Sequence, residues 1–76
     1  MKLPNCQRGK NFRIINLPHD QMLSIFSIAS GSIIKVLAKQ PFKGPVLLQI
    51  NRRKVAIGYD IAKQIIVEEV VGFGLS

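Results

Sequence analysis

The stretch from Gly44 to Glu69, GPVLLQINRRKVAIGYDIAKQIIVEE, decides the fold of this chain. Two apolar runs, Val46–Ile50 and Val55–Ile57, flank a short polar break, and such runs bounded by turn formers predict a β-hairpin. Asn51 tolerates the left-handed backbone region that a tight two-residue turn requires. Its turn partner, Arg52, stands where glycine is preferred, so the hairpin is predicted but its turn type is left open.

The hairpin is followed by a change of period. Asp60 is expected to cap a short helical turn over Ile61–Gln64, because its carboxylate can accept from the free N–H groups of that turn. The chain then returns to a β-rich run, Ile65–Val71. Strand, turn, strand, helical turn and strand make a compact unit, which the residues before Gly44 have to cover.

Two further strands are predicted upstream of this unit. Met1–Lys10 is polar and is expected to be a leader that at most packs a turn against the body. Phe12–Leu17 is predicted as the first strand, ended by Pro18, which cannot donate to a ladder. Ser32–Lys39 is predicted as the second, with one apolar face and one half-wet face. The apolar face consists of Ile34, Val36 and Ala38.

A helix is predicted between these strands, with Asp20 as its N-cap and Gly31 just after its end. Four apolar residues fall at i, i+3, i+4 and i+7, one face of an amphipathic helix, and the first three are expected to pack in the core. They are Met22, Ile25, Phe26 and Ala29. Leu23 lies on the flank of this stripe and is the helix residue expected to be exposed to a partner.

The predicted elements amount to a mainly β fold with five short strands, one early helix and one late helical turn. Strands this short suit a small antiparallel barrel, which removes the exposed edges of a flat sheet. The 76 residues are expected to form one domain, 1–76. The expected core includes Phe26, Ile34, Val36, Val55 and Ile57.

Composition limits the classes of function. Eleven basic residues against four acidic ones give a net charge of +7, which could serve nucleic acid, an anionic membrane face or an acidic protein surface. The charges are spread along the chain and the aromatic residues show no base-stacking pattern, so a solvated basic surface is favoured over a nucleic-acid footprint. There is no apolar stretch of ~20 residues and no signal peptide, which predicts a cytosolic protein. Cys6 has no cysteine partner and is expected to act as a small apolar residue at the core edge.

No set of residues predicts catalysis, and no cofactor or bound metal is expected. His19 is the only histidine, and a lone histidine is far below the specificity of a metal site. Glu68 and Glu69 are adjacent on a strand, so they point to opposite faces and cannot act as an acid–base pair. The glycines of Gly72-Phe73-Gly74 are too weak a signal for a phosphate loop.

The order of elements resembles the FeoA family, the small cytosolic partner of bacterial ferrous-iron transport. The resemblance covers about residues 9–69. It rests on Gly9 followed by FRIINL, on Phe26-Ser27-Ile28 at the place of the family's Leu-Gly-Ile segment, on the PFKGP loop and on VAI followed by DIA. Ser27 occupies the family's usual glycine, and Arg52 a position often held by glycine in the hairpin. Either substitution is expected to cost backbone freedom.

The resemblance implies an SH3-like barrel without catalysis, acting as an adaptor on the cytosolic side of the FeoB permease, whose G-domain hydrolyses GTP. It would place the chain at the inner face of the plasma membrane through that partner, and it permits weak self-association. The same barrel also occurs as an accessory domain of iron-dependent repressors. A small basic nucleic-acid-binding or regulator accessory barrel is therefore the alternative, although no specific nucleic acid is expected and no DNA-binding helix pair lies in this sequence.

An adaptor needs exposed apolar anchors ringed by charge. Three apolar residues look surplus to so small a core and are the predicted anchors: Leu23, Phe42 and Leu47. Four basic residues are predicted to steer the partner: Lys43, Arg52, Arg53 and Lys54. Two alternatives stay open: Phe42 could plug the barrel mouth, and Leu47 could pack the second face of the sheet.

Overall fold

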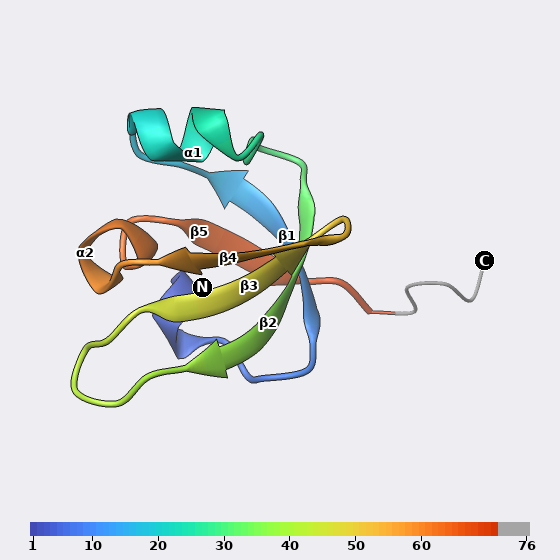
Figure 1. The fold of residues 1–76 in the computed structure, drawn as a ribbon. Coiled ribbons are helices and arrows are strands. Elements are labelled where there is room, and N and C mark those ends of the chain that lie inside the picture. Colours follow the sequence, from blue (N-terminus) through green and yellow to red (C-terminus); the bar gives the residue numbers. More distant parts are fainter. Residues whose placement is uncertain (72–76) are drawn as a thin grey trace.

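The computed structural model describes residues 1–71, apart from the side chain of Met22. Five strands and two short helices follow a one-turn 3₁₀ segment at the N-terminus (Figure 1). In chain order they are η1 (Leu3–Asn5), β1 (Asn11–Asn16), α1 (Gln21–Ile25), β2 (Ile33–Lys39), β3 (Val46–Ile50), β4 (Arg53–Ile57), α2 (Tyr59–Ala62) and β5 (Ile66–Glu69). The Gly72-Phe73-Gly74 motif lies outside the described residues.

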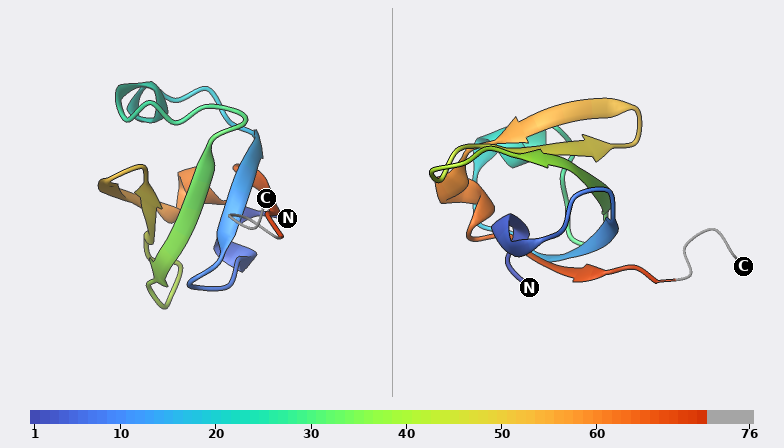
Figure 2. Two further views of the ribbon diagram at one scale, coloured as in Figure 1. Left: turned by 90° about the vertical axis from the view of Figure 1, so that its right-hand side faces the viewer. Right: turned by 90° about the horizontal axis from the view of Figure 1, so that it is seen from below.

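All strand pairs are antiparallel, and the order across the sheet is β4-β3-β2-β1-β5. The sheet curls so that its strands surround a common interior, as the view from below shows (Figure 2). Helix α1 lies over one end of this barrel (Figure 1). The predicted small antiparallel barrel with a helix at one end is confirmed.

Alternation along the strands places the core. In β3, every second residue is buried, and β4 carries two buried residues at the matching positions. The expected core positions Ile34, Val36, Val55 and Ile57 are all buried. The buried set is Leu3, Cys6, Phe12, Ile14, Leu23, Ile28, Ile34, Val36, Val46, Leu48, Ile50, Val55, Ile57, Ala62, Ile65 and Val67. Phe26 packs against this cluster while remaining partly exposed.

The N-terminal segment is part of the sheet, which corrects its description as a leader. Lys2 bridges to Ile66 of β5 in the antiparallel sense. The Leu3 N–H donates to the carbonyl of Ile65 at 3.0 Å, and the Val67 N–H donates to the Met1 carbonyl at 2.8 Å. Leu3 and Cys6 are completely buried. The segment covers the edge of β5, which would otherwise present unpaired backbone groups.

Helix α1 is shorter than predicted. It ends at Ile25, and Ser27 adopts φ of 59°. The Ser27 N–H donates to the Ser24 carbonyl at 3.0 Å and the Ile28 N–H to the Leu23 carbonyl at 2.8 Å. This pair of bonds, with one left-handed residue, is a Schellman motif.

This early end overturns part of the predicted helix face. Ile25, expected in the core, is 72% exposed, and Ala29, the last residue of the predicted stripe, is also exposed. Leu23, expected to be exposed, is only 2% exposed. Leu23 and Ile28 occupy the two positions that make the apolar contact of a Schellman motif, so the motif turns Leu23 inward. The predicted stripe required more helical turns than the chain forms.

The hairpin prediction is confirmed. Val46–Ile50 pairs with Arg53–Ile57 across a two-residue turn, in which Asn51 has φ of 56°. Arg52 has no positive φ. Only the first central residue of this turn therefore has a positive φ, as in a type II′ turn. Arg52 therefore adopts an ordinary backbone conformation, without the conformational cost that its place at a family glycine suggested.

The late helical turn is displaced by two residues from its predicted position. Gly58 is the N-cap residue of α2, so Asp60 lies inside the first turn and is not the cap. Its carboxylate lies 3.8 Å from the Lys63 ammonium. Asp60 is also favourable near the positive end of the helix dipole, which explains its place without a capping bond.

Candidate functional site

The acidic residues of β5, Glu68 and Glu69, form ion pairs on the barrel surface. Glu68 contacts the Arg13 guanidinium at 3.2 Å and Glu69 contacts the Lys10 ammonium at 3.5 Å. Within residues 1–71, no group of three or more His, Cys, Asp or Glu side chains is placed to hold a metal ion. His19 is exposed. In residues 1–71, the two carboxylates of β5 are thus engaged in ion pairs and belong to no such metal-binding group.

Cys6 is a core residue. Its side chain, in the N-terminal segment, is fully buried, and its sulfur lies 3.6 Å from the sulfur of Met1. Burial raises the pKa of the Cys6 thiol to about 11, against the lowering effect of the Lys39 charge. The group therefore stays protonated near neutral pH, whereas the thiolate is the form that reacts and binds metals.

The side chain of Phe42 is exposed to solvent. Its side chain is 99% exposed at the tip of the loop between β2 and β3, so it does not plug the barrel mouth. Phe42 and Lys43 both have positive φ, 57° and 60°, a conformation that is costly for residues with a Cβ. A Cβ on Gly44 would meet the Gln40 Cβ at 2.5 Å, so only glycine allows the close approach that shapes this loop. The loop backbone thus places Phe42 where its side chain is fully exposed.

The other two predicted anchors differ from Phe42. Leu47 is half-buried and points away from the core face of β3, as its place in the alternation predicted. It belongs to the second face of the sheet. Leu23 lies on the side of α1 that packs against the core and is buried. It therefore cannot serve as an exposed anchor, which corrects that prediction.

The predicted partner residues lie at two ends of β3. Phe42 and Lys43 precede this strand, whereas the basic residues 52–54 follow it (Figure 1). Five strand residues span about 16 Å. The two groups therefore do not form one compact patch, although both are exposed.

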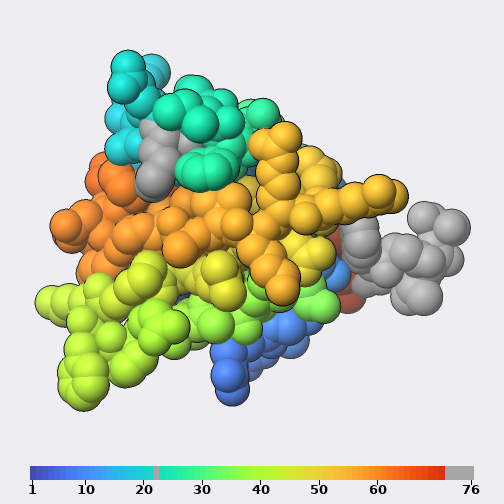
Figure 3. Space-filling view, viewed as in Figure 1, coloured from blue at the N-terminus to red at the C-terminus, as the bar shows by residue number. Residues whose placement is uncertain are grey.

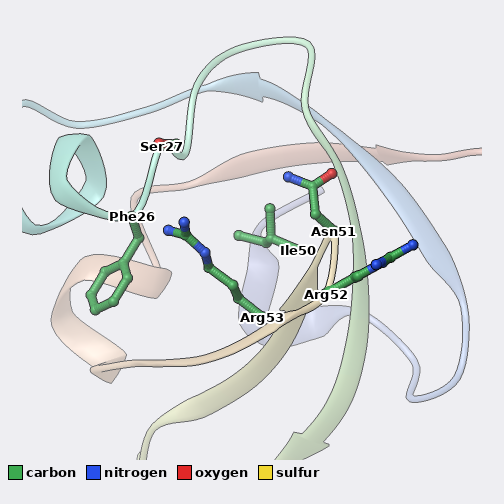
Figure 4. A pocket seen from close by; sticks show the side chains of 6 residues that line it. All are labelled: Phe26, Ser27, Ile50, Asn51, Arg52 and Arg53. Carbon is green, nitrogen blue, oxygen red and sulfur yellow. The ribbon is translucent and has the colours of Figure 1, made fainter.

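A cleft lies between the C-terminal end of α1 and the β3–β4 turn. Its volume is about 320 Å³. The lining residues are Phe26, Ser27, Ile50, Asn51, Arg52 and Arg53 (Figure 4). The sequence predicted Arg52 and Arg53 as partner residues but not Phe26, Ser27 or Ile50 as their neighbours. No local pattern signals this meeting, since the two segments are far apart in the chain and the Schellman turn brings them together.

The cleft and its surroundings carry uncompensated positive charge. The ion pairs among the described residues use Lys10, Arg13 and Lys63. Arg52, Arg53 and Lys54 make none within residues 1–71. In the space-filling view, the gold side chains of the β3–β4 hairpin project beside α1 and on the side of the molecule away from the β2–β3 loop (Figure 3). This hairpin is therefore a basic, accessible surface.

No helix among the described residues is long and apolar enough to cross a membrane.

The chain is similar to known proteins over most of its length. A family model described as FeoA domain matches residues 1–69. No curated protein matches the sequence.

Solved structures share the barrel. A crystal structure of an iron uptake regulatory protein (FeoA) is 24% identical with a TM-score of 0.80, and the match covers 91% of this chain and 94% of that one. The solution structure of iron(II) transport protein A from Clostridium thermocellum is 28% identical with a TM-score of 0.81, covering 95% of this chain and 46% of the other. A manganese-dependent transcriptional repressor is 23% identical with a TM-score of 0.83, covering 92% of this chain and 41% of the repressor.

Proposed function

Because this chain belongs to the FeoA family and so takes part in ferrous iron transport, we propose that it acts there as a non-catalytic adaptor. Its partner is the cytosolic side of a FeoB-type permease. Small barrels of this family are generally non-catalytic. The described residues fit that role, because Asp60, Glu68 and Glu69 contact lysine or arginine side chains and Cys6 is buried in the core.

The observation that carries the contact is the exposure of Phe42. A 99% exposed aromatic ring on a constrained loop has the form of an interface anchor, since aromatic side chains that fill a partner's pocket dominate binding energy. The loop conformation exists before binding, so little ordering is needed. Lys43 beside it and the basic β3–β4 hairpin supply charge that speeds encounter with an acidic surface.

A second candidate function is a nucleic-acid-binding or regulator accessory barrel. It is favoured by the fold shared with the manganese-dependent repressor and by the net charge of +7. A module with several phosphate contacts should lose affinity steeply with salt, at a log–log slope of about −0.9 per contact. We expect weak DNA binding that vanishes at physiological salt, measured by fluorescence anisotropy. Nanomolar affinity at that salt would favour this second candidate.

The adaptor proposal is tested by pull-down of the permease's cytosolic domain. Wild type should bind, and Phe42→Asp should weaken binding strongly, because it removes the anchor and places a charge in the partner's apolar pocket. Ile25→Asp is the matched control, since Ile25 is also an exposed apolar residue, at 72%, but lies on α1. Each variant is first checked by circular dichroism for a native fold.

The outcomes separate two statements. If the wild-type chain does not bind the permease domain, the adaptor proposal is wrong. If it binds and Phe42→Asp binds equally well, the adaptor proposal stands but Phe42 is not its anchor.

A further inference from the structure

The cleft between α1 and the β3–β4 turn has one cationic group directed into it. Figure 4 shows the Arg53 side chain extending toward Phe26 and Ser27, with the Asn51 amide near Ile50. Arg53 shares the alternation of the buried residues Val55 and Ile57, so its side chain leaves β4 on the core side of the sheet. Arg53 itself is exposed, whereas Val55 and Ile57 on the same side of β4 are buried.

The walls of this cleft are partly apolar. Ile50 is 4% exposed and forms the inner wall, and Phe26 packs against the core with part of its ring still accessible. Low-dielectric walls strengthen the field of a charge beside them. Ser27 and Asn51, the polar lining residues, bear no charge, and no acidic residue lines the cleft. The Arg53 guanidinium therefore faces a site that favours an anion.

We infer that this cleft binds the carboxylate of a Glu or Asp side chain from a protein partner, with an adjacent apolar side chain lying against Phe26 and Ile50. The inference rests on the proposed function, because it names the chemistry of a segment that the partner presents. A guanidinium offers a carboxylate two parallel hydrogen bonds. The apolar wall gives the neighbouring side chain a contact that a bare anion cannot use.

A protein carboxylate fits the site better than a nucleic acid. Phosphate backbones are bound by rows of basic groups that neutralise several phosphates. Here one guanidinium enters an otherwise uncharged cleft, while Arg52, at its rim, points away from the other labelled side chains (Figure 4). The two neighbouring arginines therefore have different roles. Arg53 binds, and Arg52 contributes only to the surrounding positive field.

The test uses the full chain and two tripeptides that differ in one charge, acetyl-Phe-Glu-Leu-amide and acetyl-Phe-Gln-Leu-amide. Binding is followed by ¹⁵N NMR at low salt. The Glu peptide should shift the Arg53 side-chain signal and the amides of residues 26–27 and 50–53, with a dissociation constant of about 1 mM. The Gln peptide should bind about five- to tenfold more weakly, because it offers no charge-assisted bond.

Three variants make the test specific. Arg53→Glu should weaken Glu-peptide binding about tenfold or more, and Arg52→Glu about twofold. Arg8→Glu is the matched control, because it makes the same charge change at an exposed residue outside the cleft and should leave binding nearly unchanged. The inference is overturned by equal binding of the two peptides, by shifts spread over the other lysines and arginines, or by equal effects of the three variants. It is also overturned if a single-stranded oligo-dT ten-mer binds the cleft more tightly than the Glu peptide.

The permease domain distinguishes this inference from the proposed function. If that domain binds wild type and Arg53→Glu equally, the adaptor proposal survives and the cleft is not the contact. If the Glu peptide binds as expected but the permease domain does not bind at all, the cleft chemistry stands and the proposed partner is wrong.

Discussion

Replacing Ser27 by glycine is expected to stabilise this protein. Ser27 ends helix α1 with φ of 59°, and the N–H groups of Ser27 and Ile28 close the Schellman bonds. Glycine is the usual residue at this left-handed position, because any Cβ there comes too close to the following carbonyl oxygen. The family resemblance also places glycine at this position. The serine hydroxyl makes no hydrogen bond within residues 1–71, so its loss costs no described contact.

The magnitude is the difference between two opposing effects. A residue with a Cβ loses about 1–2 kcal/mol in the left-handed helical region. Glycine has more conformational freedom to lose on folding, which costs about 0.5–1 kcal/mol. Ser27→Gly should therefore raise the free energy of unfolding by about 0.5–1 kcal/mol. For a domain of this size the melting temperature should rise by about 3–6 °C.

Unfolding in urea and by heat, both followed by far-UV circular dichroism, measures this change, since the chain has no tryptophan for fluorescence. Ser24→Gly is the matched control, because Ser24 is exposed in the interior of the same helix. There glycine meets a right-handed backbone and should destabilise by about 0.5 kcal/mol. Ser27→Ala keeps the Cβ and should bring no gain. A neutral or destabilising Ser27→Gly, with an unchanged urea m-value, would refute the assignment of strain to this residue.

Because burial raises the pKa of the Cys6 thiol from 9.0 to about 11, folding favours its protonated form. The free energy of unfolding should thus fall as pH rises between these values, by up to about 3 kcal/mol, and Cys6→Ala should show a smaller fall in parallel urea titrations. Ile57→Ala should cost about 2–5 kcal/mol in urea unfolding, whereas Ile25→Ala, at a 72% exposed residue, should stay within about 0.5 kcal/mol; similar costs would contradict the core assignment. Leu23→Asp should abolish the cooperative thermal transition, because it buries a charge without a partner; a native melting curve would contradict the burial of Leu23. Anaerobic calorimetry should detect no stoichiometric Fe²⁺ binding, and tight binding that His19→Ala removes would overturn this expectation.

The residue patterns by themselves determined the strands and the faces they present. Alternation with a period of two marks the inner residues of a half-buried strand wherever the strand is paired, so Ile34, Val36, Val55 and Ile57 could be assigned to the core from the sequence. The turn at Asn51 was predictable for a similar reason, because its left-handed backbone is a local preference of that residue. Cys6 was correctly placed among the apolar residues.

The length of α1, the covering of the β5 edge and the make-up of the cleft were decided only by tertiary structure. The apolar stripe of a helix can be predicted from residue spacing. The residue at which the helix ends depends on a balance of free energies, because the apolar contact between Leu23 and Ile28 must stabilise the fold by more than the left-handed backbone of Ser27 costs. The pairing of Lys2 with Ile66 joins opposite ends of the chain, and no local propensity encodes such a contact. Nor could spacing show that Phe26 lies beside Arg53 in one cleft. Sequence periodicity specifies which side of an element is apolar, whereas the partner that covers that side is chosen by long-range packing.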